Sequence, residues 1–206
     1  MVKLVAPRLI DRSRPCHLGA NTDIGSRIGG FPPDGVRPRR VHELTVYFGT
    51  IAFAVDSDRE VSIFLTDEDN ALLRGGQVYS DDVAGAVEIV LHGRSRRGSA
   101  ALLASPLSGR AIVIGAEQDD WYVTEDGRVP IGRHKMGGRP SIHKEWDLEG
   151  VCAELQQSRY VQVVQLDFPG PEDLTGIGSW PFGDGMFHIL AREPFDPQDW
   201  IWFWEN

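Results

Sequence analysis

The sequence predicts an α+β fold, made of two pseudo-repeats of short antiparallel strands with few helices, packed as one unit. Three observations support this prediction. The chain of 206 residues contains 23 glycines and 13 prolines, which favour many turns and short elements. Runs of β-branched and aromatic residues are bounded by turn residues. A short glycine-rich motif occurs twice, about a hundred residues apart.

Strands are predicted where β-branched and aromatic residues are concentrated. The first covers 44–55, with a possible bulge at Gly49, because glycine tolerates the irregular backbone of a bulge. A turn at 56–58 leads back into a second strand at 61–65. Residues 83–92 are compatible with strand or helix. Further strands are predicted at 110–116, 160–168, 185–191 and, with alternating faces, 200–204.

Two segments are predicted to be helical. Thr66 can cap free backbone N–H groups, the acids at 67–69 suit the positive end of a helix dipole, and Gly75-Gly76 would end the helix. Residues 145–157 place apolar side chains on one helical face, at the spacing i, i+3, i+4 and i+7. These side chains are Leu148, Val151, Cys152 and Leu155.

The recurring motif consists of a basic residue, an apolar residue, Gly-Gly, one further residue and proline, at 26–32 and again at 134–140. Each copy precedes a strand, a turn and a second strand that contains phenylalanine. The pattern predicts pseudo-repeat 1 at about 22–75, a connecting region at 76–130 and pseudo-repeat 2 at about 131–206.

We interpret both motifs as structural turns, because glycine permits a positive φ and proline fixes the direction in which the chain leaves. The turn residues are Gly29, Gly30, Pro32, Gly137, Gly138 and Pro140. An alternative is that exposed backbone N–H groups bind an anion there, beside Arg27 or Lys135.

These motifs resemble the YwqG-like family, a bacterial domain. Its members carry an SKIGG-x-P element, a QLD or QID strand and a G-x-L-x-F-F strand. Here 26–32 and 135–140 match the first, 164–167 the second and 185–189 the third. The first copy departs from the pattern, because 51–53 reads Ile-Ala-Phe. The resemblance implies a single domain over 1–206 with a duplicated α+β fold and no established catalytic site. Some relatives look like immunity proteins encoded beside toxins.

The formal net charge is −9, and the acidic excess lies beyond residue 50. A protein that binds nucleic acid needs lysine and arginine to displace counterions from phosphates, so we expect no nucleic-acid partner. Arg94, Arg96 and Arg97 are interpreted as an exposed loop. No run approaches the roughly 20 apolar residues of a membrane span, and no signal peptide is recognised. These features predict a cytoplasmic protein without a membrane partner.

No residue is predicted to be catalytic, and no metal or cofactor is expected. The histidines do not form HExxH, the two cysteines do not form CxxC, and neither GxSxG nor a P-loop occurs. His134, His143 and Glu145 flank the second Gly-Gly turn and could converge. Trp200, Trp202 and Trp204 would share one strand face, as core or as an interface.

The predicted function is that of an immunity-type protein, which binds and neutralises a cognate bacterial toxin, a secreted antibacterial effector. Acidic segments would capture a basic toxin through complementary charge. The predicted partner-binding residues are Asp67, Glu68, Asp69, Asp81, Asp82, Asp119 and Asp120. One alternative is a small-ligand binding or regulatory module that uses the cleft between the two halves, where the two Gly-Gly turns could meet. A second is a cryptic hydrolase centred on His134, His143 and Glu145.

Overall fold

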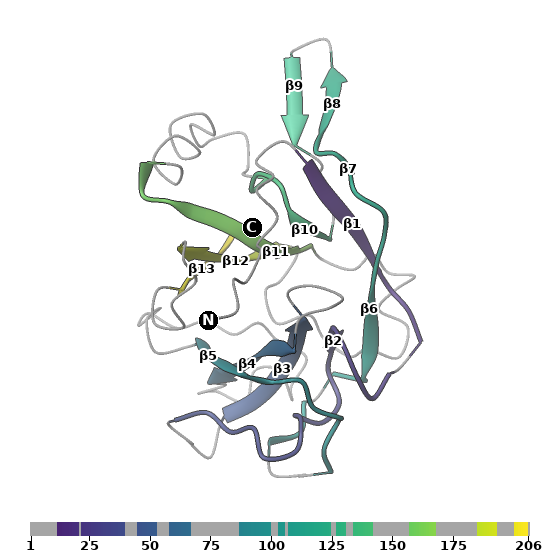
Figure 1. The fold of residues 1–206 in the computed structure, drawn as a ribbon, viewed down its shortest axis with the longest axis vertical. Helices are drawn as coiled ribbons and strands as arrows, with labels where there is room; N and C mark the ends of the chain where they lie inside the picture. The colour runs from purple at the N-terminus through teal and green to yellow at the C-terminus, as the bar shows by residue number, and fades with distance from the viewer. Residues whose placement is uncertain are drawn as a thin grey trace. The chain divides into compact units, whose positions relative to one another are not determined.

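The fold is described from a computed structural model (Figure 1). The structure describes residues 12–20, 22–39, 45–52, 58–66, 87–99, 103–105, 107–124, 127–130, 134–141, 157–167, 185–192 and 200–205. These residues form thirteen strands, and every pairing between them that is assigned a register is antiparallel. Within these ranges, no helix is long and apolar enough to cross a membrane.

The predicted α+β fold with two pseudo-repeats is wrong, because the regular structure of the described residues is almost entirely antiparallel sheet. The predicted helices after Thr66 and at 145–157 fall on residues that the structure does not describe, apart from their outermost residues. Some strands were not predicted from the sequence. The polar segment Arg12–Leu18 pairs through its backbone, which requires no apolar pattern in the side chains.

The chain divides into two compact units, each assembled from separate stretches of chain. The first unit contains 1–17, 114–167 and 184–206, and the second contains 18–113 and 168–183.

In the first unit, five strands pair in the order β13, β12, β11, β10, β1, and β7 pairs with β1. Their bounds are Trp200–Glu205, Met186–Arg192, Tyr160–Leu166, Lys135–Gly137, Arg12–Leu18 and Gln118–Asp119. A separate hairpin joins β8 (Trp121–Thr124) to β9 (Gly127–Pro130). Central positions of β11 and β12 form the core, where Val164, Phe187 and Ile189 are fully buried. The strands predicted at 160–168, 185–191 and 200–204 are confirmed within two residues.

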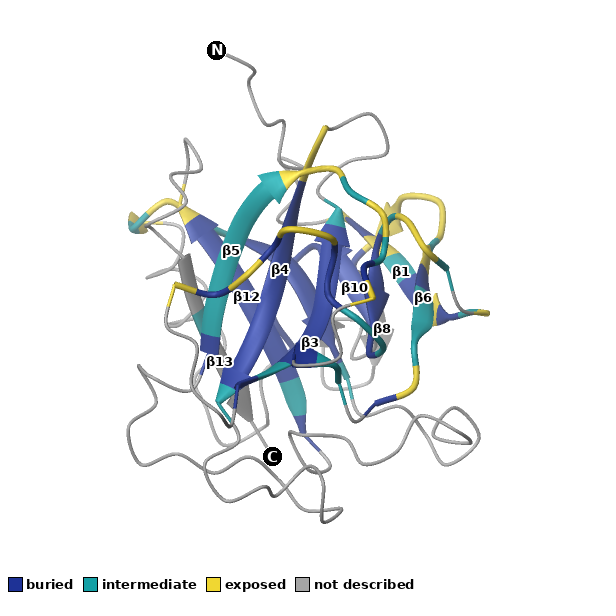
Figure 2. Ribbon diagram, turned by 90° about the horizontal axis from the view of Figure 1, so that it is seen from below, coloured by how far each residue is buried: buried dark blue, intermediate teal, exposed yellow. Residues whose placement is uncertain are grey.

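In the second unit, the strands pair in the order β6, β2, β3, β4, β5. Their bounds are Arg110–Ile114, Arg27–Ile28, Thr45–Ala52, Arg59–Thr66 and Val87–Gly93. Figure 2 shows β3 and β4 as the buried strands and β5 as the half-buried one. The predicted bulge at Gly49 is confirmed by a register shift between Tyr47 and Gly49. A Cβ atom at Gly49 would lie 2.7 Å from the carbonyl oxygen of Arg27, so a larger residue would push β2 away.

Both Gly-Gly pairs occupy the left-handed region that favours glycine. The φ angles are 67° and 75° at Gly29 and Gly30, and 74° and 75° at Gly137 and Gly138. A Cβ atom at Gly29 would lie 2.4 Å from the carbonyl oxygen of Ser108, and one at Gly138 would lie 2.3 Å from the Asp120 carboxylate. Each pair therefore lets a neighbouring segment approach the backbone closely. Pro32 and Pro140, which follow, are buried.

Gly29→Ala is expected to reduce the free energy of unfolding far more than Gly35→Ala. Both glycines have positive φ, but nothing lies within 4 Å of a Cβ atom at Gly35. The control should lose about 1–2 kcal/mol from backbone strain alone. Gly29→Ala adds a backbone collision and should lose about 2–5 kcal/mol in total. Urea denaturation followed by tryptophan fluorescence measures both, and equal losses would show that the close approach at Gly29 is unimportant.

Candidate functional site: a buried polar network and an arginine-lined pocket

Polar side chains occupy part of one face of the sheet in the second unit, beside Phe64 and Tyr47 of a hydrophobic cluster. Residues two apart on a strand share a face, so Glu60 and Ser62 of β4 lie on the same side. Thr50 of β3 is opposite Ser62, and Arg27 of β2 is opposite Thr50. All four are at most 1% exposed. An ordinary half-buried sheet would turn such residues to water, so this face is a buried polar layer.

A chain of hydrogen bonds crosses three strands of this face. Tyr47 Oη lies 2.6 Å from Thr50 Oγ1, which lies 2.9 Å from Ser62 Oγ, which lies 2.8 Å from His92 Nε2. His92 Nδ1 is 2.6 Å from the carbonyl oxygen of Gly93, which can only accept. His92 Nδ1 therefore carries the proton, and Ser62 donates to Nε2. Each hydroxyl then donates to the next, from Tyr47 towards His92.

Burial sets the protonation of both ends of this chain. Desolvation raises the pKa of Tyr47 to about 12, with the charge of Arg27 opposing the rise. Desolvation lowers the pKa of half-buried His92, and its hydrogen bond to the Gly93 carbonyl opposes that change. The phenol and the neutral imidazole that the chain requires are thus the favoured forms near neutral pH.

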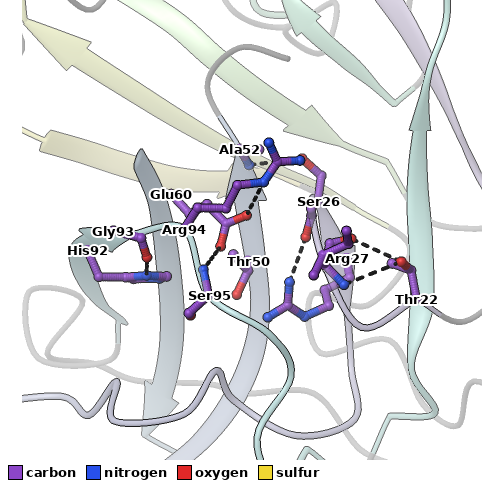
Figure 3. A network of polar contacts seen from close by, with 12 residues as sticks. Thr22, Ser26, Arg27, Thr50, Ala52, Glu60, His92, Gly93, Arg94 and Ser95 are labelled. Atoms are coloured by element: carbon purple, nitrogen blue, oxygen red, sulfur yellow. Dashed lines mark hydrogen bonds and ion pairs between the residues drawn. The ribbon is translucent and has the colours of Figure 1, made fainter. Parts of the chain in front are cut away.

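Two buried charges flank the chain. Arg27 Nη1 donates to the carbonyl oxygen of Gly25 at 2.7 Å, whereas its Nε and Nη2 meet no hydrogen-bond acceptor among the residues described. The carboxylate of Glu60 accepts the Ser95 N–H at 3.4 Å and lies 4.0 Å from Arg94 Nε. Figure 3 shows Arg94 and Ser95 both directed at Glu60. Glu60 therefore attaches the segment after β5 to the middle of the sheet.

We call residues 94–98 the arginine loop. Its backbone is joined to the segment 22–36 by three hydrogen bonds. The Arg97 N–H donates to the carbonyl oxygen of Asp23 at 2.6 Å, and the Gly98 N–H to that of Pro32 at 2.8 Å. The Asp34 N–H donates to the carbonyl oxygen of Arg96 at 3.2 Å. Both segments are held at fixed positions, although they lie far apart in the sequence.

A pocket of about 420 Å³ opens between these two segments. It is lined by Asp23, Phe31, Arg96, Arg97, Gly98 and Ser99. The Arg97 guanidinium lies over the Phe31 ring, with 4.9 Å from its carbon to the ring centroid. A Cβ atom at Gly30 would lie 3.6 Å from the same guanidinium. Within the described part of the chain, the side chains of Arg96, Arg97 and Asp23 make no hydrogen bond or ion pair. The pocket therefore combines two available cations, one available anion and an aromatic ring.

The first unit holds a buried ion pair of a different kind. Lys135 Nζ lies 2.9 and 3.0 Å from the two carboxylate oxygens of Asp120, and both side chains are fully buried. The Arg139 N–H donates to the same carboxylate at 2.8 Å. Asp120, one of the residues predicted to bind a partner, is thus directed at the second Gly-Gly turn. Its neighbour Asp119 is 80% exposed and pairs with Arg12 at 3.0 Å.

Beside this pair lies a buried histidine. The Nδ1 atom of His188 is 3.3 Å from Gln162 Oε1, and Gln162 Nε2 donates to the carbonyl oxygen of Gly137 at 2.9 Å. Burial, followed by the charge of Lys135, lowers the pKa of His188 to about 3. His188 is therefore neutral, and Nδ1 donates to the amide oxygen.

The remaining predicted residues are only partly described. Asp67, Glu68, Asp69, Asp81, Asp82, His143 and Glu145 lie outside the described residues. His134 is buried, and its Nδ1 accepts the Asp167 N–H at 3.0 Å, which occupies that nitrogen. Trp202 is half-buried and lies 6.3 Å from Phe187 between ring centroids. In the described ranges, no three histidine, cysteine or acidic side chains cluster as metal ligands.

Sequence reasoning identified the arginine loop but missed its surroundings. Asp23 carried no signal, and Phe31 stood out only as part of the first Gly-Gly motif, more than 60 residues before the arginine loop. The network of Ser62 and His92 was not predicted either, because the sequence of one strand does not determine which residues of the neighbouring strand it pairs with. Comparison with known protein families, curated proteins and solved structures found no match for this chain.

Proposed function

We propose that the protein is a small-ligand-binding module and that a small anion occupies the pocket of the second unit. The observation that carries this proposal is the presence of two arginine side chains, without an acidic partner among the described residues, on the wall of a concave site. The volume of about 420 Å³ lies within the usual range of ligand pockets.

The surroundings of Arg97 support the choice of an anion. Its guanidinium lies over the Phe31 ring and close to Gly30, so the side chain already has packing partners before a ligand arrives. A planar guanidinium binds carboxylates and phosphates through two parallel N–H groups. Because the side chain is already ordered, binding loses little conformational entropy.

The walls of the pocket are attached to the sheet and to the segment 22–36. Glu60 holds the start of the arginine loop through Ser95, while backbone hydrogen bonds to Asp23 and Pro32 hold its end. The buried polar network thus acts as the support of the pocket. In this role it makes no contact with the ligand.

Arg97→Gln is expected to weaken anion binding at least tenfold, because hydrogen bonds to charged groups contribute about 1.5–3 kcal/mol. Isothermal titration calorimetry with acetate, benzoate, inorganic phosphate and phenyl phosphate measures the effect. Arg37→Gln is the matched control, since Arg37 is an exposed arginine of the same unit outside the pocket lining. Equal binding by both variants, or no binding of any anion by the unaltered protein, would refute the proposal.

Toxin neutralisation stays a prediction. Of the seven acidic residues that it invokes, Asp119 and Asp120 are described, and only Asp119 is exposed. Its support remains the sequence resemblance and the acidic composition. The hydrolase alternative likewise stays a prediction, with His134 already occupied by the Asp167 N–H. The pocket therefore favours small-ligand binding, although at a site within the second unit and not in the cleft between halves that the sequence predicts.

A further inference from the structure

We infer that the ligand is a zwitterion, a small molecule that carries both an oxyanion and an ammonium group, as free α-amino acids do. This inference rests on the proposed function, because it names the ligand class of the same pocket. The observation behind it is that the pocket lining contains charges of both signs that are not paired with one another.

Asp23 distinguishes this pocket from a simple anion site. It lines the pocket together with Arg96 and Arg97, yet no ion pair joins it to either arginine in the described structure. An ion pair between exposed side chains would contribute below about 1 kcal/mol, so the unpaired state of these groups costs the protein little. Their separation leaves the carboxylate and the guanidinium groups available to two different groups of one ligand.

The position of Asp23 is defined by its neighbours. Its carbonyl oxygen accepts the Arg97 N–H at 2.6 Å. Thr22 Oγ1 donates to the carbonyl oxygen of Ile24 at 3.0 Å and accepts the Ile24 N–H at 3.4 Å, which closes a tight turn around Asp23. Figure 3 shows Thr22 in this role at the edge of the network. The carboxylate of Asp23 therefore projects from an ordered backbone that is tied to the arginine loop.

The balance of charge selects among anions. A ligand with two negative charges, such as a phosphate monoester, would gain from both arginines but would be repelled by Asp23. A ligand with one carboxylate and one ammonium group matches all three side chains. The ligand's carboxylate would bind the guanidinium of Arg97, and its ammonium group would bind the carboxylate of Asp23. Phe31 and the volume of about 420 Å³ leave room for a side chain of any proteinogenic amino acid.

The test is a titration of the full chain with the twenty proteinogenic L-amino acids by isothermal titration calorimetry. The tightest binder is then compared with its N-acetyl derivative, which lacks the ammonium group, and with its carboxamide, which lacks the carboxylate. We expect each derivative to bind at least tenfold more weakly than the parent amino acid.

Two variants assign these losses to residues. Asp23→Asn should weaken binding of the amino acid about tenfold and leave binding of the N-acetyl derivative unchanged, so that the preference for a free amine disappears. Arg97→Gln should weaken the amino acid and its N-acetyl derivative alike. Asp23 is exposed and Arg97 is half-buried, and circular dichroism checks that each variant is folded.

The outcomes separate the two proposals. If benzoate or phosphate binds but no amino acid does, or if Asp23→Asn changes nothing, the zwitterion inference fails while the anion-binding function stands. If neither amino acids nor simple anions bind, both fail. A free amine preference that depends on Asp23 would support the inference, because an anion site alone has no reason to distinguish the N-acetyl derivative.

Discussion

Lys135→Met lowers the free energy of unfolding by about 3–5 kcal/mol, the expected loss when one partner of a buried ion pair is removed. The carboxylate of Asp120 would remain fully buried, with the Arg139 N–H still donating to it at 2.8 Å. Methionine fills a similar volume, so the loss reports the uncompensated charge and not a cavity. Urea denaturation followed by tryptophan fluorescence measures it.

The adjacent aspartate provides the control. Arg12→Met removes the partner of Asp119, in a pair whose side chains are 44% and 80% exposed. Such pairs contribute below about 1 kcal/mol. The double change Lys135→Met with Asp120→Leu should recover most of the stability, because no charge is then left buried. If Lys135→Met lowers the free energy of unfolding no more than Arg12→Met does, the buried pair has no special role in the first unit.

Acid destabilises the protein at pH values where few carboxylates titrate. The pKa of His188 is about 3 in the folded chain, against an ordinary value of 6.5. Between these values the unfolded chain binds a proton that the folded chain does not bind. The contribution of neutral His188 to the free energy of unfolding is therefore fully present above pH 6.5. It falls as the pH drops through this window, by about 2 kcal/mol between pH 6.5 and 5.

His188→Gln should flatten this pH dependence, even though the variant is less stable at neutral pH. Some slope will remain, since burial also lowers the pKa of His92. His17→Gln serves as the control, because His17 is exposed, and its pH profile should match that of the unaltered protein. Urea denaturation at several pH values between 7.5 and 5 gives the comparison. Identical slopes for all three proteins would show that His188 does not govern the acid response.

The longer strands could be predicted from the sequence because their side chains carry the signal. Residues 44–55 and 61–65 are rich in β-branched and aromatic residues, and they correspond to β3 and β4. The bulge followed from Gly49. The short or polar strands could not be predicted. β1 contains Arg12, Arg14 and Pro15, and it exists because distant backbones pair with it.

The candidate site was even less visible in the sequence. In β4, Glu60 and Ser62 alternate with Val61 and Ile63, a pattern typical of a strand with one solvated face. Both faces are buried instead. Only the three-dimensional fold brings His92 to Ser62, or Phe31 to Arg97. The sequence therefore identified the arginine cluster as exposed but could not show that it lines a pocket.

The pairing of β1 has a consequence for the order in which the protein is made. Arg12 bonds to Glu117 and Asp119, which lie 105 and 107 residues further along the chain. At a synthesis rate of about 5–20 residues per second, β1 waits about 5–20 s on the ribosome before these partners exist. During that time its backbone N–H and C=O groups must be satisfied by water. The scarcity of apolar side chains in β1, which hid it from prediction, keeps a waiting strand from joining the wrong partner.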